Sequence, residues 1–338
     1  MTINLDALKD SPRLLFEIPL RPIQGQRFQP TGFPGLGAAT FQTEQGLSLL
    51  VESAQSMANR LELTCWDEAQ KDLRPAVNGL SHVRVLRQGA FLTDSIIESH
   101  RINSPYLRKG KDQSFLSRFK SEIDRMPDGP IDRRMLAGIF LKFDACSLIH
   151  GAFIPDKELK GGRLRVARAL SAFIEANGVR VAASGGVKND HVNPQGVTKD
   201  GFGNVPFSRD EYTAEAITLY LNLDLGQIRG YGLRDSVESM LILLSLYKTR
   251  VLIDGSLRFR TACDLEVDFD KVKGIVSTRP KGFPLPELDS LENQLAISIA
   301  KCRDLMTITE VHYDDELKKG KDVAEAEEHE ADSGDGED

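Results

Sequence analysis

Apolar and polar side chains alternate in two segments of the second half of the chain, residues 217–225 and 257–267. In the first segment, isoleucine and leucine occupy the odd positions, and Thr218, Tyr220, Asn222 and Asp224 lie between them. A period of two is typical of a β-strand with one buried face, because successive side chains point to opposite sides of a sheet. Each segment is therefore predicted to be one half-buried strand.

Helical patterns accompany these strands. Asp235 with Glu238, and Asp289 with Glu292, have the spacing of a capping box and precede apolar residues three and four positions apart. Ser53 is the predicted N-cap of another helix. The remaining predicted elements are strands at 14–20, 47–51, 83–86 and 307–312 and helices at 93–101 and 114–125. Short alternating strands mixed with helices favour an α+β fold, with an antiparallel or mixed sheet and helices on one face.

Two segments rich in glycine and proline interrupt this pattern. Residues 21–35 hold three prolines and three glycines and are predicted to form a loop. Residues 184–204 hold five glycines between strand-like flanks. A loop of this length in a compact domain is usually functional or disordered, so we interpret it as a long hairpin that reaches out of the body.

Charge is distributed unevenly along the chain. The formal net charge is −7, but residues 314–338 hold 12 acidic residues and three lysines, so residues 1–313 carry +2. The acidic stretch has almost no large apolar side chain and is predicted to be a disordered tail. The body, residues 1–313, is predicted to be one domain with insertions near 100–160 and 184–213.

The cysteines and apolar runs indicate the compartment. Cys65, Cys146, Cys263 and Cys302 are scattered, which predicts reduced thiols in a cytoplasmic protein. No signal peptide is recognisable, and no apolar run approaches the length of about 20 residues that crosses a bilayer. We therefore expect no contact with a membrane.

Motifs for catalysis are missing from the sequence. It has no phosphate-binding glycine loop, no zinc-protease motif, no hydrolase nucleophile motif and no histidine spacing for a metal. Asp190 and His191 are adjacent and are candidates for an acid–base pair, although a solvated loop is the simpler interpretation. We expect no catalytic residue, no metal and no cofactor.

Basic and amide residues instead form three clusters. The first lies in the loop after residue 20, and the second, residues 100–134, has nine Lys or Arg against five Asp or Glu and includes Arg108 and Lys109. The third comprises Lys160, Arg163, Arg165 and Arg168. Such side chains bind phosphates and sugars, so the clusters indicate binding of nucleic acid. For any single residue, a solvated helix face with local ion pairs is the favoured interpretation.

Five stretches of the sequence carry a family resemblance. They are RLLFEIPLRPIQGQRFQPTGFPGLGAATF (13–41), LLVESAQSMANRLE (49–62), SHRINSPY (99–106), VKNDHVNP (187–194) and GNVPFSRDEYTA (203–214). Together they resemble the backbone subunit of the type I-G CRISPR Cascade, formerly called type I-U, in the RAMP superfamily. The resemblance spans residues 11–313.

The resemblance implies a modified RRM-like, or ferredoxin-like, sheet that forms a palm, with a finger-like insertion and a thumb hairpin. It also implies a non-catalytic scaffold. Several copies bind the spacer of a CRISPR RNA (crRNA) along its phosphate backbone, form a helical filament and present the guide for pairing with target DNA in antiviral defence. The implied partners are neighbouring copies, the large subunit, the RNA-processing subunit and a helicase-nuclease.

The predicted site follows from these clusters and from the resemblance. The residues expected to contact RNA are Arg21, Gln24, Gln26, Arg27, Gln29, Ser53, Gln55, Asn59, Arg60, Arg101, Asn103, Arg163, Arg165, Lys188, Asn189 and His191. Phe202, Val205 and Phe207 are the expected apolar wedge of the thumb. The alternative is a RAMP-family endoribonuclease that cuts crRNA precursor or target RNA, with Asp94, Asp190 and His191 as its candidate catalytic residues.

Overall fold

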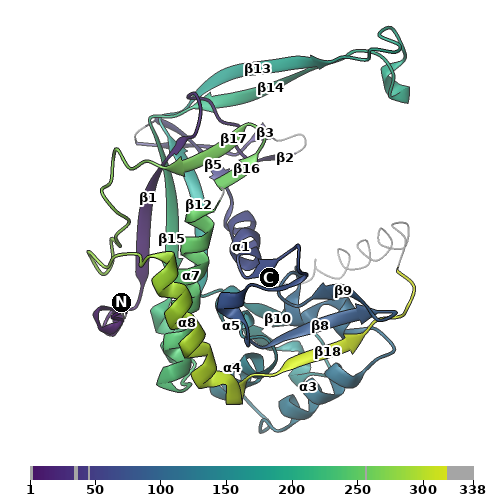
Figure 1. Ribbon diagram of the computed structural model, residues 1–338, viewed down its shortest axis with the longest axis vertical. Coiled ribbons are helices and arrows are strands. Elements are labelled where there is room, and N and C mark those ends of the chain that lie inside the picture. The colour runs from purple at the N-terminus through teal and green to yellow at the C-terminus, as the bar shows by residue number, and fades with distance from the viewer. Residues whose placement is uncertain (1–2, 34–36, 45, 256, 318–338) are drawn as a thin grey trace.

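A seven-stranded antiparallel sheet forms the centre of the computed structural model, which describes residues 3–33, 37–44, 46–255 and 257–317 (Figure 1). The strand order is β16-β17-β1-β15-β12-β5-β4. Four of these strands and two helices form the core: β1 (Leu14–Pro22), α1 (Ala54–Leu63), β12 (Leu170–Asn177), β15 (Ala216–Leu223), α7 (Asp235–Asp254) and β17 (Cys263–Val267). Their chain order, β-α-β-β-α-β, and spatial order confirm the predicted RRM-like sheet.

The predicted strand at 217–225 is confirmed by β15, which pairs with β1 on one side and β12 on the other. The prediction for 257–267 is wrong in one respect. Two antiparallel strands, β16 (Leu257–Arg260) and β17, replace the single strand. Alternation continues through their tight turn, so the sequence pattern does not reveal where the chain reverses.

A long hairpin extends from the sheet between β12 and β15, at the top of Figure 1. Its arms are β13 (Arg180–Lys188) and β14 (Val205–Thr213), which pair over their full length. We call this hairpin the thumb. The hairpin predicted around the glycine-rich stretch is therefore present.

A second group of elements lies below the sheet in Figure 1 and is called the lower lobe. It contains β8 (His82–Arg87), β9 (Ala90–Asp94), β18 (Ile308–His312), α3 (Ser114–Asp124), α4 (Arg133–Phe143) and α5 (Ser147–His150). β18 pairs with β8 in parallel, so the last described strand closes this lobe. The helix predicted at 93–101 is wrong, because Thr93 and Asp94 pair with β8.

The remaining strands and α-helices include two further strands of the central sheet and a long helix that packs against α7. They are β2 (Gly32–Phe33), β3 (Gly37–Ala38), β4 (Thr40–Thr43), β5 (Gly46–Glu52), β6 (Trp66–Asp67), β7 (Asp72–Leu73), α2 (Pro105–Arg108), β10 (Ala152–Ile154), β11 (Leu164–Val166), α6 (Leu225–Gly230) and α8 (Leu288–Cys302). None of the described helices is long and apolar enough to cross a membrane.

The helix N-termini only partly follow the predicted caps. The Ser53 hydroxyl accepts a hydrogen bond from the Ser56 N–H at 3.2 Å, which confirms it as the N-cap of α1. The predicted capping boxes of α7 and α8 are wrong, because these helices begin after Arg234 and Glu287 without a side-chain cap. Asp235 and Asp289 instead lie in the first turn, where negative charge favours the helix dipole.

The described chain ends within the predicted acidic tail, whose residues 318–338 lie outside the described residues. Its first residues contact the lower lobe. Asp314 accepts a hydrogen bond from the Gln88 N–H, and Asp315 accepts one from the Lys111 N–H at 3.1 Å. The boundary of the folded body therefore lies after Asp315 rather than before Asp314.

Phe28 attaches the first loop to the base of the thumb. Its side chain is completely buried, and its backbone exchanges two hydrogen bonds with Tyr212 of β14, at 2.9 and 2.8 Å. The loop at 21–35 is thus anchored at its centre, and its conformation depends on the thumb strand.

Replacement of Phe28 by alanine leaves a cavity between this loop and β14. We expect the free energy of unfolding to fall by about 3–5 kcal/mol in urea titrations. Phe41→Ala is the matched control, because Phe41 is 38% exposed on the edge strand β4 and should cost less than about 1 kcal/mol. Equal losses for the two variants would show that Phe28 does not anchor the loop.

Candidate nucleic-acid interface

Helix α1 lies between the thumb-bearing sheet and the lower lobe (Figure 1). Its buried face carries Met57, Ala58 and Leu61, which pack into the core. Gln55 and Asn59 are exposed on its other face, where the Gln55 amide donates to the Asn59 side chain at 2.9 Å. The helix therefore presents amide groups in the region where the central sheet, the palm of the predicted fold, meets the lower lobe.

The cations of the first loop are mostly engaged by carboxylates. Arg21 donates to Glu266 and Asp270 and lies 3.6 Å from Asp268. These partners raise the pKa of Arg21, with the Glu266 hydrogen bond as the largest cause. Arg27 lies 3.6 Å from Glu211 but remains 56% exposed. Of these two, Arg27 is the better placed to meet an external anion.

The amides of the same loop differ in exposure. Gln24 and Gln26 are exposed, whereas Gln29 is half-buried. The Gln29 backbone donates to Ala262 at 2.7 Å and accepts from Arg260 at 2.8 Å. Gln29 thus has a structural role in joining the loop to the β16–β17 hairpin.

Arg60 also contacts this hairpin rather than pointing freely outward. Its guanidinium donates to the Phe259 carbonyl at 3.1 Å and lies 4.7 Å from the centre of the Phe259 ring. Such a cation–π contact holds the planar group in place.

A hollow of about 920 Å³ lies beside α1, between residues 99–109 and 150–168. Its lining includes Arg101, Arg108, Lys109, Arg165 and Arg168 and a single carboxylate, Asp156. We call it the basic hollow. Its size matches that of pockets for small ligands, and its charge favours anions.

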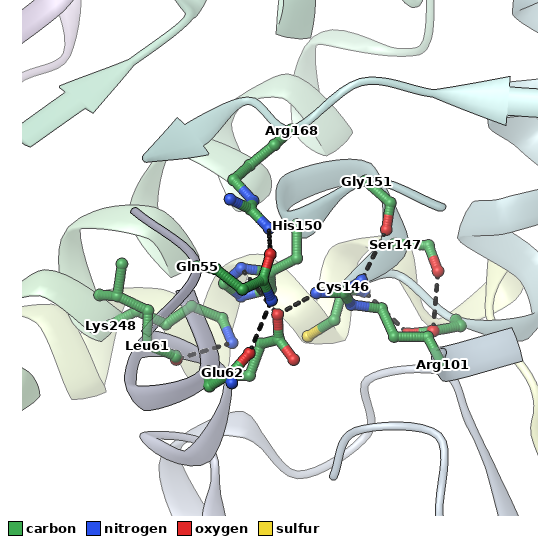
Figure 2. Close-up of polar contacts among 12 residues, drawn as sticks. Gln55, Leu61, Glu62, Arg101, Cys146, Ser147, His150, Gly151, Arg168 and Lys248 are labelled. Atoms are coloured by element: carbon green, nitrogen blue, oxygen red, sulfur yellow. Dashed lines mark hydrogen bonds and ion pairs between the residues drawn. The ribbon is translucent and has the colours of Figure 1, made fainter. Parts of the chain in front are cut away.

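Arg168 connects the basic hollow with α1. Its guanidinium donates to the Gln55 side chain at 3.0 Å, a contact drawn in Figure 2. Predicted residues of α1 and of the third basic cluster are therefore neighbours in space, although more than 100 positions separate them.

The floor of the basic hollow contains a buried ion pair. Arg101 is only 8% exposed, donates to Glu62 and to the Gly151 carbonyl, and is shown with these partners in Figure 2. Burial raises the pKa of Glu62, and the Arg101 charge opposes that shift. The guanidinium of Arg101 thus serves as the counter-ion of Glu62 inside the protein, and contact of Arg101 with RNA stays a prediction.

Free cationic groups remain at the rim of the hollow. Lys109 is exposed, and so is Arg165, whose guanidinium lies 5.9 Å from the centre of the exposed Phe153 ring on the paired strand β10. Arg108 is held by Asp156 and Asn103, and Asn103 also lines the hollow. Arg163 is exposed but donates to the Lys160 and Gly129 carbonyls.

The far end of the thumb is folded on itself. Asp190 accepts hydrogen bonds from the N–H groups of Val192, Asn193 and Gly203, at 2.8–2.9 Å. These bonds lower the pKa of Asp190, with that from Asn193 the largest. Gly203 is required there, because a Cβ atom would clash with the Gly196 carbonyl oxygen.

The predicted thumb residues lie around this folded end. Lys188, Asn189 and His191 are exposed, as are the rings of Phe202 and Phe207, whereas Val205 is half-buried. Val192 and Val197, which were not predicted, are 95% and 61% exposed. The apolar surface of the thumb is therefore larger than the sequence prediction and shifted toward its tip.

The candidate catalytic residues of the alternative function do not converge. Asp94 is completely buried, and one of its oxygens lies 2.6 Å from His82 Nδ1. Asp190 is on the thumb, where its carboxylate orders the loop. Within the described ranges, no three His, Cys, Asp or Glu side chains are grouped as metal ligands would be.

Two features of the interface were not recognised as site residues from the sequence. Lys109 and Arg168 belong to basic clusters, but nothing in their spacing shows that they line one hollow. Phe153 is exposed on a three-residue strand too short to give a periodic signal. Only the fold brings these groups together.

The β-α-β-β-α-β core, with a thumb between its second and third strands, defines an RRM-like protein with insertions. Residues 14–181, about half of the chain, match the family model described as CRISPR-associated protein GSU0053 (Cas_GSU0053). The chain belongs to this family of CRISPR-associated proteins, and the resemblance found in the sequence is confirmed.

Other known proteins are only distantly similar. No curated protein matches the sequence. A chain of a structure titled "CRISPR RNA-guided surveillance complex, pre-nicking" is 12% identical, with a TM-score of 0.38 and coverage of 75% of this chain and 76% of that chain. Csc2 of Thermofilum pendens is 8% identical, with a TM-score of 0.31 and coverage of 89% and 80%.

Asp190→Asn should loosen the tip of the thumb and leave the body intact, because an amide is a weaker acceptor for three N–H groups. We expect faster amide hydrogen exchange at Val192, Asn193 and Gly203 and an unchanged melting temperature. In the wild-type protein, the pKa of Asp190 is lower when the tip is folded than when it is unfolded. The stabilisation of the folded tip by the Asp190 carboxylate is therefore full above the ordinary pKa of aspartate and is lost as the pH falls through the lowered pKa. Unchanged exchange at these amides would contradict this role.

Proposed function

We propose that the protein is a non-catalytic backbone subunit of a CRISPR Cascade complex and binds crRNA along its phosphate backbone. Membership of the CRISPR-associated family supports this proposal. The observation that carries it is the basic hollow, which continues directly onto the exposed amides of α1 through the Arg168–Gln55 contact.

The chemistry of this surface suits a guide rather than a sequence reader. A protein that presents a guide must hold the backbone and leave the base edges free to pair with target DNA. Arg165, Lys109 and Arg27 supply exposed charge, and Gln55 and Asn59 supply amides for phosphate and sugar. Phe16, on a core strand where an RRM often stacks bases, is only 1% exposed.

The thumb supports assembly of several copies. Val192, Val197 and Phe202 expose apolar surface at its tip, and such surface is unfavourable in water unless a partner covers it. A neighbouring copy or RNA is the proposed partner. Head-to-tail contacts of this kind, repeated without closing a ring, give a helical filament. The large subunit, the RNA-processing subunit and the helicase-nuclease are the further proposed partners.

Single-stranded RNA should bind with little preference for sequence and with a log–log salt slope of about −0.7 per phosphate neutralised. In the double variant Lys109→Ala/Arg165→Ala, we expect the slope to flatten by about 0.7 for each phosphate that the variant no longer neutralises. Fluorescence anisotropy of labelled RNA over a series of salt concentrations measures both quantities.

The matched control is Lys273→Ala/Lys301→Ala, which removes two exposed charges outside the basic hollow. The control should retain the wild-type slope. An equal effect of both double variants would mean that net charge rather than the hollow binds RNA. Cleavage of the bound RNA, with or without divalent metal, would favour the endoribonuclease over the scaffold.

A further inference from the structure

The acidic residues 322–338 lie beyond the point where the described chain leaves the lower lobe. They include nine Asp or Glu and no Lys or Arg, and Lys318, Lys319 and Lys321 precede them. We call residues 318–338 the acidic segment. A stretch of this charge requires a cationic surface if it is to bind the folded body.

The chain leaves the fold beside the basic hollow. The Tyr313 ring packs edge-on against the Tyr106 ring of α2, with 5.2 Å between the centroids. The His312 N–H donates to Asp112, and Asp315 accepts from the Lys111 N–H. These contacts fix the exit point against residues 106–112, the same short segment that supplies Arg108 and Lys109 to the hollow.

The charge of the basic hollow and the position of the exit point both favour binding of the acidic segment. The lining has five Lys or Arg, of which Arg101 is paired with Glu62 and Arg108 with Asp156. The other three are Lys109, Arg165 and Arg168, and the exposed Lys109 and Arg165 lie at the rim. Five residues span at most about 17 Å, and the exit point already contacts Lys111, two positions from Lys109 of the lining. Tethering on so short a linker gives an effective concentration on the order of millimolar.

We propose that the acidic segment binds the basic hollow of its own chain and competes there with RNA. The regulatory part of this inference rests on the proposed function, whereas the contact between segment and hollow does not. The acidic segment excludes nucleic acids that bind weakly and without specificity. An RNA that makes further contacts along α1 and the thumb displaces the segment.

A peptide of residues 318–338 with a fluorescent label tests the contact without RNA. Added to protein truncated after Leu317, it should bind, and the affinity should fall as salt rises. A control peptide with every Asp and Glu replaced by Asn and Gln should not bind. Lys109→Ala/Arg165→Ala in the truncated protein should weaken binding of the acidic peptide, whereas Lys273→Ala/Lys301→Ala should not.

RNA binding by the full chain tests the competition. If the segment occupies the hollow nine-tenths of the time, truncation strengthens RNA binding about tenfold at low salt, and the difference disappears at high salt. A full-length variant with the nine carboxylates of 322–338 changed to amides should behave like the truncated protein. Because this variant keeps the full chain, its result does not depend on whether the truncated protein folds correctly. Circular dichroism checks the folding of the truncated protein.

The outcomes separate the two proposals. No binding of the acidic peptide, together with equal RNA affinity of full and truncated chains, would overturn the inference and leave the proposed function standing. Peptide binding to a truncated protein that binds no RNA would support the contact but overturn the proposed function. Peptide binding unaffected by Lys109→Ala/Arg165→Ala would place the segment elsewhere and overturn the inference.

Discussion

The buried ion pair of Glu62 and Arg101 joins the two halves of the molecule. Glu62 lies near the end of α1, which packs on the palm, and Arg101 lies in the lower lobe and also donates to Gly151. A buried charge is tolerated only with a partner, and loss of one partner costs about 3–5 kcal/mol. This contact therefore helps to hold α1 against the lower lobe, and Arg101 also lines the basic hollow (Figure 2).

Internal ion pairs also decide which cations face outward. The basic clusters of the sequence predict a broad cationic surface, yet Arg21, Arg108 and Arg101 all bind carboxylates of the same chain. Most of these partners are distant in sequence, so composition cannot reveal them. Among the cations that line the basic hollow, Lys109 and Arg165 remain exposed, and both lie at its rim.

The thumb shows how an exposed hairpin keeps its shape without a core. Its arms pair along nine residues each, and the carboxylate of Asp190 organises the turn through backbone N–H groups. Local hydrogen bonds therefore set the shape of the tip, while its exposed valines and phenylalanines make no contribution to the core of the body. Such a tip is suited to contacts made outside the monomer.

Local periodicity was sufficient to predict β1, β5, β8, β15, α1, α3 and the cores of α7 and α8, because burial of one face leaves a pattern in neighbouring residues. The resemblance to a CRISPR-associated family likewise rests on short runs such as Arg27 to Pro34. The hairpin within 257–267, the strand ending at Asp94 and the closing of the lower lobe by β18 depend on pairing across the chain. The basic hollow is the clearest case. Gln55, Lys109 and Arg168 become neighbours only when α1 packs between palm and lobe, since long-range packing leaves no trace in local spacing.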